Sequence, residues 1–180
     1  MNLKLLKLHW KLFFWFFTGR LKKISSRLDI NFTKGNPEKI LVFFPMEEPS
    51  FRVALYAFRN IGKNNPHKIK FKFIVKEKFK QLFHLQIGDT VYIQNTEFNK
   101  LLPDEKYLRQ SLKTDTFDII VDLNPTFHLG IAGLINALAS EMKVGFSSRF
   151  SDRFYNIQLD ISQTGIMEKG FQQINLILSQ

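Results

Sequence analysis

The sequence predicts an α/β fold: a mostly parallel sheet of five to six strands with helices on both faces, preceded by an N-terminal amphipathic helix. Three observations predict it. Short apolar runs of strand length alternate with helical patterns, which favours parallel strands joined by helices. Residues 119–121 are β-branched and uncharged, as in a strand covered on both faces. Polar residues that can open a helix follow this strand directly, and open α/β sheets bind ligands at such strand ends.

Size and composition limit the alternatives. A chain of 180 residues can form one domain with a real core, but not two full α/β domains. It contains no Cys, which excludes disulfides and thiolate metal sites. Three of its four His (His9, His67 and His84) are scattered along the chain, and His128 stands apart from them, so we expect no histidine metal site.

The basic charge is concentrated at the N-terminus. Residues 1–36 hold eight Lys and Arg against the single acid Asp29, whereas the other residues hold 18 basic and 15 acidic side chains. The pattern predicts a helix over residues 3–17 with a lysine stripe among Leu, Phe and both Trp, which suits an anionic bilayer surface. We therefore expect residues 1–36 to form a basic amphipathic arm. Its expected membrane contacts are Lys4, Lys7, Trp10, Lys11, Phe14 and Trp15.

The length and sequence of the arm also bear on other interpretations of it. A helix over residues 3–17 would be about 22 Å long, too short for a hydrocarbon core of about 30 Å. The uncharged run 12–18 is short for a signal peptide, and no small-x-small cleavage site follows. The helix could instead dock on its own domain or on a second copy. No nucleic-acid-binding motif is present, so nucleic acid is not an expected partner.

The body, residues 37–180, begins after a hinge at residues 35–37. Strands are expected at 39–44, 70–75, 90–93, 118–123, 142–146 and, at a sheet edge, 156–160. Helices are expected at 51–61, around 79–83, and at 104–112, 129–139 and 168–178. Ser50 is the expected N-cap of the first of these helices. Asn124, followed by Pro125 as the first helical residue, is the expected N-cap of the helix after the 118–123 strand.

Polar residues cluster where the 118–123 strand ends. They are Asp122, Asn124, Thr126 and His128. This group could hold the hydroxyls of a ligand, with helix N–H groups available for an anion. Alternatively, Asn124 and Thr126 cap the helix while Asp122 bonds the local backbone.

Two further loops carry candidate site residues. Glu47 and Glu48 follow the first strand of the body, where they could form an acid/base pair or a solvated loop. In residues 147–153, Arg149 and Arg153 with three hydroxyls could clamp a phosphate or an acidic sugar, or form a surface loop with an Arg149–Asp152 pair. No strand is followed by a Gly-rich phosphate-binding fingerprint, so no nucleotide cofactor is expected.

The order of these segments resembles the N-terminal half of glycosyltransferase family 9, the lipopolysaccharide heptosyltransferase group. The matching segments are 39–44, 57–59, 73–75, 117–124 and 143–146, and the resemblance covers residues 38–180. It implies a Rossmann-like domain equivalent to the acceptor-binding half of a GT-B glycosyltransferase. The C-terminal domain, which supplies most of the nucleotide-sugar site in this family, has no counterpart before Gln180.

The resemblance implies a protein at the inner, cytoplasmic face of the cytoplasmic membrane that binds a glycan or lipid-linked sugar in cell-envelope polysaccharide or lipopolysaccharide synthesis. The family's first loop carries a Gly-Asp pair whose Asp takes the acceptor proton. Here residues 45–50 read Pro-Met-Glu-Glu-Pro-Ser, so Glu47 or Glu48 is the candidate base. Three functions stay open: a non-catalytic module or split-enzyme half with a donor-domain partner, a complete small glycosyltransferase acting as a homo-oligomer, and a structural protein that assembles through the arm.

Overall fold

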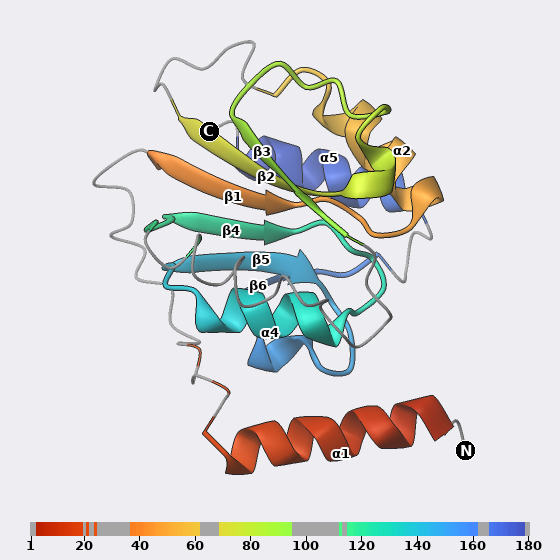
Figure 1. Ribbon diagram of the computed structural model, residues 1–180, viewed down its shortest axis with the longest axis vertical. Coiled ribbons are helices and arrows are strands. Elements are labelled where there is room, and N and C mark those ends of the chain that lie inside the picture. Colours follow the sequence, from red (N-terminus) through yellow and green to blue (C-terminus); the bar gives the residue numbers. More distant parts are fainter. Residues whose placement is uncertain are drawn as a thin grey trace.

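Six parallel strands form the centre of the molecule. The computed structural model describes residues 3–19, 21, 24, 37–61, 69–94, 112, 115–161 and 166–178. Its strands form one sheet in the order β3-β2-β1-β4-β5-β6, and every pairing is parallel (Figure 1). The predicted Rossmann-like α/β fold is confirmed. The strands are β1 (Lys39–Phe43), β2 (Lys70–Lys76), β3 (Asp89–Ile93), β4 (Ile119–Asp122), β5 (Met142–Phe146) and β6 (Ile157–Leu159), the last at an edge as predicted.

The helices lie close to their predicted positions. They are α1 (Leu3–Phe17), α2 (Glu48–Phe58), α4 (Leu129–Ala137) and α5 (Met167–Leu178), with 3-10 turns η2 (Glu77–Phe79) and η3 (Ser151–Arg153). The helix predicted at 104–112 lies outside the described residues except for Leu112.

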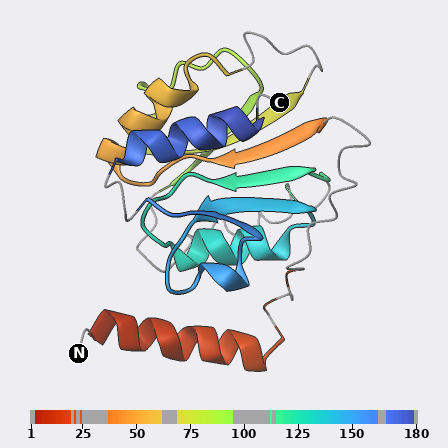
Figure 2. The ribbon, with the colours of Figure 1, turned by 180° about the vertical axis from the view of Figure 1, so that it is seen from behind.

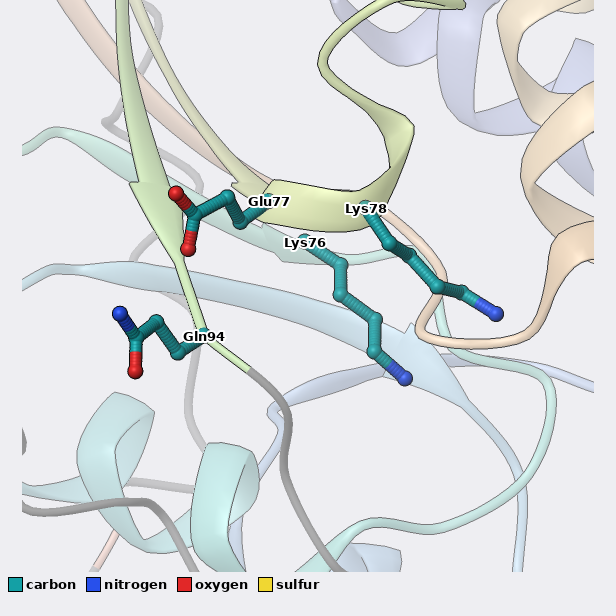
Figure 3. Close-up of a pocket in the computed structure, with 4 residues that line it drawn as sticks. All are labelled: Lys76, Glu77, Lys78 and Gln94. Atoms are coloured by element: carbon teal, nitrogen blue, oxygen red, sulfur yellow. The ribbon is translucent and has the colours of Figure 1, made fainter.

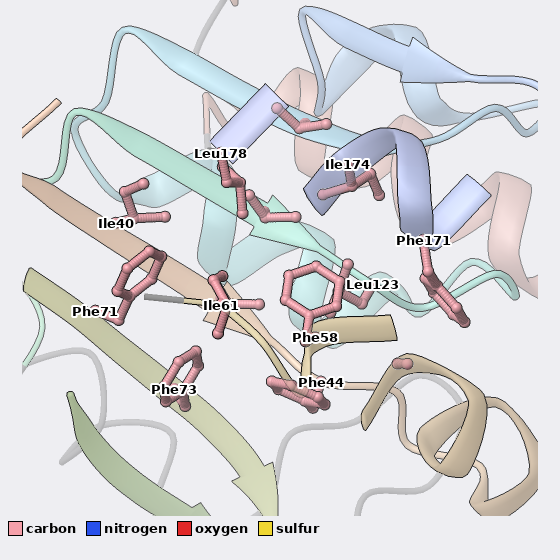
Figure 4. Packing of buried hydrophobic residues seen from close by; sticks show 14 of the residues in the cluster. Ile40, Phe44, Phe58, Ile61, Phe71, Phe73, Leu123, Phe171, Ile174 and Leu178 are labelled. Atoms are coloured by element: carbon pink, nitrogen blue, oxygen red, sulfur yellow. The ribbon is translucent and has the colours of Figure 1, made fainter. Parts of the chain in front are cut away.

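Alternate residues of each central strand point to opposite faces of the sheet and enter two separate apolar layers. Ile40 and Val42 of β1 join the layer under α2 and α5, which is rich in Phe (Figure 4). Leu41 and Phe43 join the layer under α4. Burial on both faces explains why the β1 and β4 sequences are continuous apolar runs instead of alternating patterns.

Helix α1 packs against the body on the α4 side. Leu8 and Leu12 keep only 3% and 2% of their surface exposed and belong to the same apolar layer as α4. The half-buried Trp15 lies over Gly133 of α4, where an added Cβ would come within 2.6 Å of its ring. The alternative in which the helix docks on its own domain is therefore what the structure shows. Among the described residues, no helix is long and apolar enough to cross a bilayer.

The two predicted helix caps are wrong. Helix α2 begins three residues earlier than expected: Glu47 is its N-cap, Pro49 lies in the first turn, and Ser50 is buried within the helix. Proline is favoured there because the first turn needs no N–H from it. Helix α4 begins only after His128, because the Asn124 side chain is engaged elsewhere, with the backbone of Met46.

Candidate functional site

The connections that leave β1 and β4 diverge, because α2 and α4 cover opposite faces of the sheet. Such a reversal of strand order creates the crevice in which open α/β sheets bind ligands. In this protein a hydrogen bond crosses that point: the backbone N–H of Met46 donates to Asn124 Oδ1 over 2.8 Å, and the bond is buried. The loops after the two central strands are therefore held together.

Asp122, at the end of β4, is the centre of a buried hydrogen-bond network. Its Oδ1 accepts the backbone N–H and the side-chain N–H of Asn124 at 3.0 and 2.6 Å, and its Oδ2 accepts the Tyr155 hydroxyl at 2.5 Å. Burial raises the pKa of Asp122, although the hydrogen bonds from Tyr155 and Asn124 oppose the rise. Burial and the neighbouring Asp122 together raise the pKa of Tyr155 well above its usual value. The side chains of Asp122 and Asn124 are thus engaged in hydrogen bonds within the protein.

An open pocket lies at the C-terminal ends of β2 and β3. It has a volume of about 610 Å³ and is lined by Lys76, Glu77, Lys78 and Gln94. The Lys76 and Lys78 side chains extend in the same direction, whereas Glu77 and Gln94 extend to the other side (Figure 3). The lining residues therefore carry two ammonium groups that extend one way and a carboxylate and an amide that extend the other way.

The pocket is linked electrostatically to the loops after β1 and β4. Partial burial and the neighbouring Lys78 lower the pKa of Lys76, while the charge of Glu47 opposes this. The Lys76 ammonium also approaches the carbonyl oxygen of Met46, at 3.4 Å. The charges of Asp122, Glu47 and Lys76 also act on the pKa of His128. These residues therefore form one charged cluster at the C-terminal edge of the sheet.

The two candidate bases have different environments. Glu48 is ion-paired with Arg52 on the next turn of α2, with Oε1 2.8 Å from Nη2, and this pairing lowers the pKa of Glu48. Glu47 is exposed at the N-cap of α2 and makes no side-chain capping bond. A general base needs a carboxylate that can reach the substrate proton. Glu47 is better placed for this role than Glu48.

The arginine loop lies elsewhere, next to α1. The Arg153 guanidinium is 5.8 Å from the centre of the Phe16 ring, and Phe150 packs edge-on against His9 at 5.0 Å. Asp152 accepts a hydrogen bond from Gln158. Arg149 and Thr126 are both exposed. The structure thus brings Glu47, Asp122, Asn124 and His128 together and places Arg153 against the N-terminal helix.

Sequence reasoning missed the pocket residues and Tyr155. Lys76 and Lys78 end and follow a strand that was predicted, at the same edge of the sheet as Glu47, so their position was a usable signal. Tyr155 gave no such signal, because it reaches Asp122 from a loop after β5. Among the described residues, no group of His, Asp or Glu could hold a metal ion.

The pKa of His128 leads to a pH prediction. Burial, helped by Lys76, lowers this pKa below its usual value of 6.5, so the folded state binds fewer protons than the unfolded state just below that pH. The contribution is fully present above pH 6.5 and is lost as the pH falls through the folded-state pKa. We expect His128→Gln to lose less unfolding free energy than the wild type between pH 7 and 5, as measured by urea denaturation. The exposed His84→Gln serves as the control and should follow the wild-type profile.

Comparison with known proteins supports the fold. The structure is similar to two structures of the E. coli heptosyltransferase WaaC, one with ADP-2-deoxy-2-fluoro heptose (19% identity, TM-score 0.58, 77% of this chain and 47% of that one) and one with ADP (19%, 0.59, 77% and 46%). It is also similar to a family 9 glycosyltransferase from Veillonella parvula (12%, 0.61, 78% and 41%). The fold is glycosyltransferase-like.

The chain spans less than half the length of the proteins whose structures it matches. No protein-family model matches its sequence, and no curated protein matches it either. At such low identity the similarity concerns the fold, and the chemistry has to be argued from the cluster described above.

Proposed function

We propose that this glycosyltransferase-like protein works at a membrane surface, where it binds an acidic glycan or a lipid-linked sugar acceptor at the C-terminal edge of its sheet. The observation that carries the proposal is the pairing of Lys76 and Lys78 on one side of an open pocket, near Glu47. The heptosyltransferase-like fold supports a role in cell-envelope polysaccharide or lipopolysaccharide synthesis. The expected location is the inner face of the cytoplasmic membrane.

The pocket has the chemistry that an acidic sugar requires. Lysine ammonium groups bind carboxylate and phosphate oxygens through charge-assisted hydrogen bonds. Of the other two lining residues, Glu77 has a carboxylate that can accept hydrogen bonds from hydroxyl groups, and Gln94 has an amide that can both donate and accept them. A volume of about 610 Å³ falls within the usual range for small-ligand sites.

We propose that the chain acts either as a non-catalytic acceptor module or as one half of a split enzyme. In the second case, a partner protein with a donor domain supplies the nucleotide sugar. The exposed Glu47 at the edge of the site favours a second candidate, a small glycosyltransferase that works as a homo-oligomer. Incubating the pure protein with an acceptor and nucleotide-sugar donors separates them: transfer that Glu47→Gln abolishes supports the homo-oligomeric enzyme, and transfer that needs an added donor-domain protein supports the split enzyme.

Calorimetric titration with sugars of one ring type tests acceptor binding. We expect glucose 6-phosphate and glucuronic acid to bind measurably tighter than neutral glucose, because only the charged sugars can pair with Lys76 and Lys78. Replacing both lysines by alanine should weaken binding of the charged sugars by about tenfold or more, which corresponds to about 1.4 kcal/mol.

The matched control is Lys169→Ala, which removes an exposed lysine from α5. This variant should bind the charged sugars as the wild type does. Equal affinity for charged and neutral sugars, or an equal loss in the control, would contradict the proposed site. A protein that binds neither sugar nor vesicles would instead fit the structural protein that assembles through the arm.

A further inference from the structure

We infer that α1 enters the bilayer surface while it remains packed on α4, through an outward ridge formed by Leu6, Trp10, Phe13 and Phe17. This inference rests on the membrane location in the proposed function and identifies the face that meets lipid.

Helix α1 is apolar on two opposite sides. Its inward side, with Leu8 and Leu12, is buried in the body. On the outward side, positions 6, 10, 13 and 17 recur at helical spacing, and their side chains are 38%, 67%, 55% and 73% exposed. Both ribbon views place α1 at the periphery, with α4 between it and the sheet (Figures 1 and 2). The ridge therefore faces away from the domain.

The ridge is continuous. The ring of Phe13 lies 6.2 Å from that of Trp10 and 4.8 Å from that of Phe17. Soluble proteins rarely leave a contiguous apolar patch of this kind uncovered unless it binds a partner or a membrane. This exposure marks the ridge as a binding surface.

The surrounding charge identifies that partner as lipid. Lys7 is exposed on the same helix, Arg153 lies against Phe16, and no acidic residue occurs before Asp29. Anionic headgroups would neutralise these cations while the aromatic rings settle at the level of the headgroups. A second copy would instead bring the same cations against its own, at an electrostatic cost.

Because α1 is packed on α4, its contact with lipid sets the orientation of the whole domain at the membrane surface. The sequence alone predicted lipid contact for both Trp10 and Trp15, but the structure separates them. Trp10 belongs to the ridge, whereas Trp15 lies against Gly133 on the side of the body. Because α1 is too short to span a bilayer, it lies flat and holds the sheet in one orientation.

The protein has two Trp, which makes a direct test. Trp15→Phe leaves Trp10 as the fluorescent reporter, and Trp10→Phe leaves Trp15. Each protein is mixed with phosphatidylglycerol–phosphatidylcholine vesicles that contain brominated lipid. We expect Trp10 emission to shift to the blue and to lose most of its intensity, while Trp15 emission stays unchanged.

A second measurement compares substitutions of similar exposure. Phe13→Ser should reduce partition into these vesicles by about tenfold or more, because it removes one large apolar side chain from the ridge that enters the lipid. Leu176→Ser changes a residue that is 63% exposed on α5, at the opposite face of the sheet, and should leave partition unchanged. Circular dichroism checks that both variants fold.

Each contrary outcome has its own meaning. Quenching of both Trp would show that α1 undocks, which overturns the inference but leaves the membrane location intact. Vesicle flotation without quenching of Trp10 would also overturn it, because another surface would then bind lipid. No flotation with any anionic vesicle would overturn both the inference and the membrane location. A dimer whose Trp10 emission shifts to the blue without vesicles would assign the ridge to a second copy.

Discussion

Replacing Phe44 by alanine is expected to lower the free energy of unfolding by about 3–5 kcal/mol, the usual cost of truncating a fully buried Phe. Phe44 follows β1 and has no exposed surface. Its ring lies between 5.3 and 5.9 Å from four others, three of them in edge-to-face geometry, so the loss includes favourable ring contacts as well as a cavity (Figure 4). Those rings are Phe51, Phe58, Phe73 and Phe83.

Urea denaturation followed by circular dichroism measures this loss. Phe17→Ala is the matched control, because the same atoms are removed from a side chain that is 73% exposed. Its unfolding free energy should change by no more than about 0.5 kcal/mol. A loss for Phe44→Ala as small as that of the control would mean that the Phe layer under α2 and α5 is not packed as described.

The second large effect concerns the buried carboxyl group. We expect Asp122→Ala to cost about 2–5 kcal/mol of unfolding free energy, because it leaves the Tyr155 hydroxyl and the Asn124 side-chain N–H buried without their acceptor. Asp122→Asn should cost much less. Its carbonyl oxygen can still accept from Asn124, and its N–H can donate to the Tyr155 oxygen.

The pH dependence of these variants has a defined sign. Burial raises the folded-state pKa of Asp122 above its usual value of 3.8, so the folded state binds more protons than the unfolded state above that pH. This contribution is complete below pH 3.8 and is lost as the pH rises through the folded-state pKa. Asp122→Asn should not show this loss of unfolding free energy when urea denaturation is measured over a pH series that starts below 3.8. An identical pH profile in the wild type and in Asp122→Asn would contradict burial of the carboxyl group.

The sheet could be predicted from the sequence because its strands are specified locally. Residues 40–43 and 119–121 are short apolar runs, as expected for strands that are buried on both faces. The alternation of strands and helices then leaves few arrangements other than a parallel sheet. The helix caps could not be predicted in this way, because the backbone partner of Asn124 is Met46, 78 residues away.

The candidate site was predicted only in part, for a similar reason. Glu47 and His128 lie near strand ends at the C-terminal edge of the sheet, where their positions in the sequence predicted them. Pattern cannot say which polar atoms are already used inside the protein, as those of Asp122 are. In α1, Leu12 and Phe13 are adjacent and equally apolar, yet one is buried and the other exposed. Only the position of α4 decides between them.

The contact between Trp15 and Gly133 has a consequence for how this protein can vary. Any side chain at position 133 would occupy space that the indole ring now fills, starting with a Cβ 2.6 Å from that ring. A larger residue at position 133 is therefore compatible with the packing of α1 on α4 only if the residue at position 15 is smaller. The residue sizes at positions 15 and 133 therefore jointly decide whether the N-terminal helix can dock on the domain.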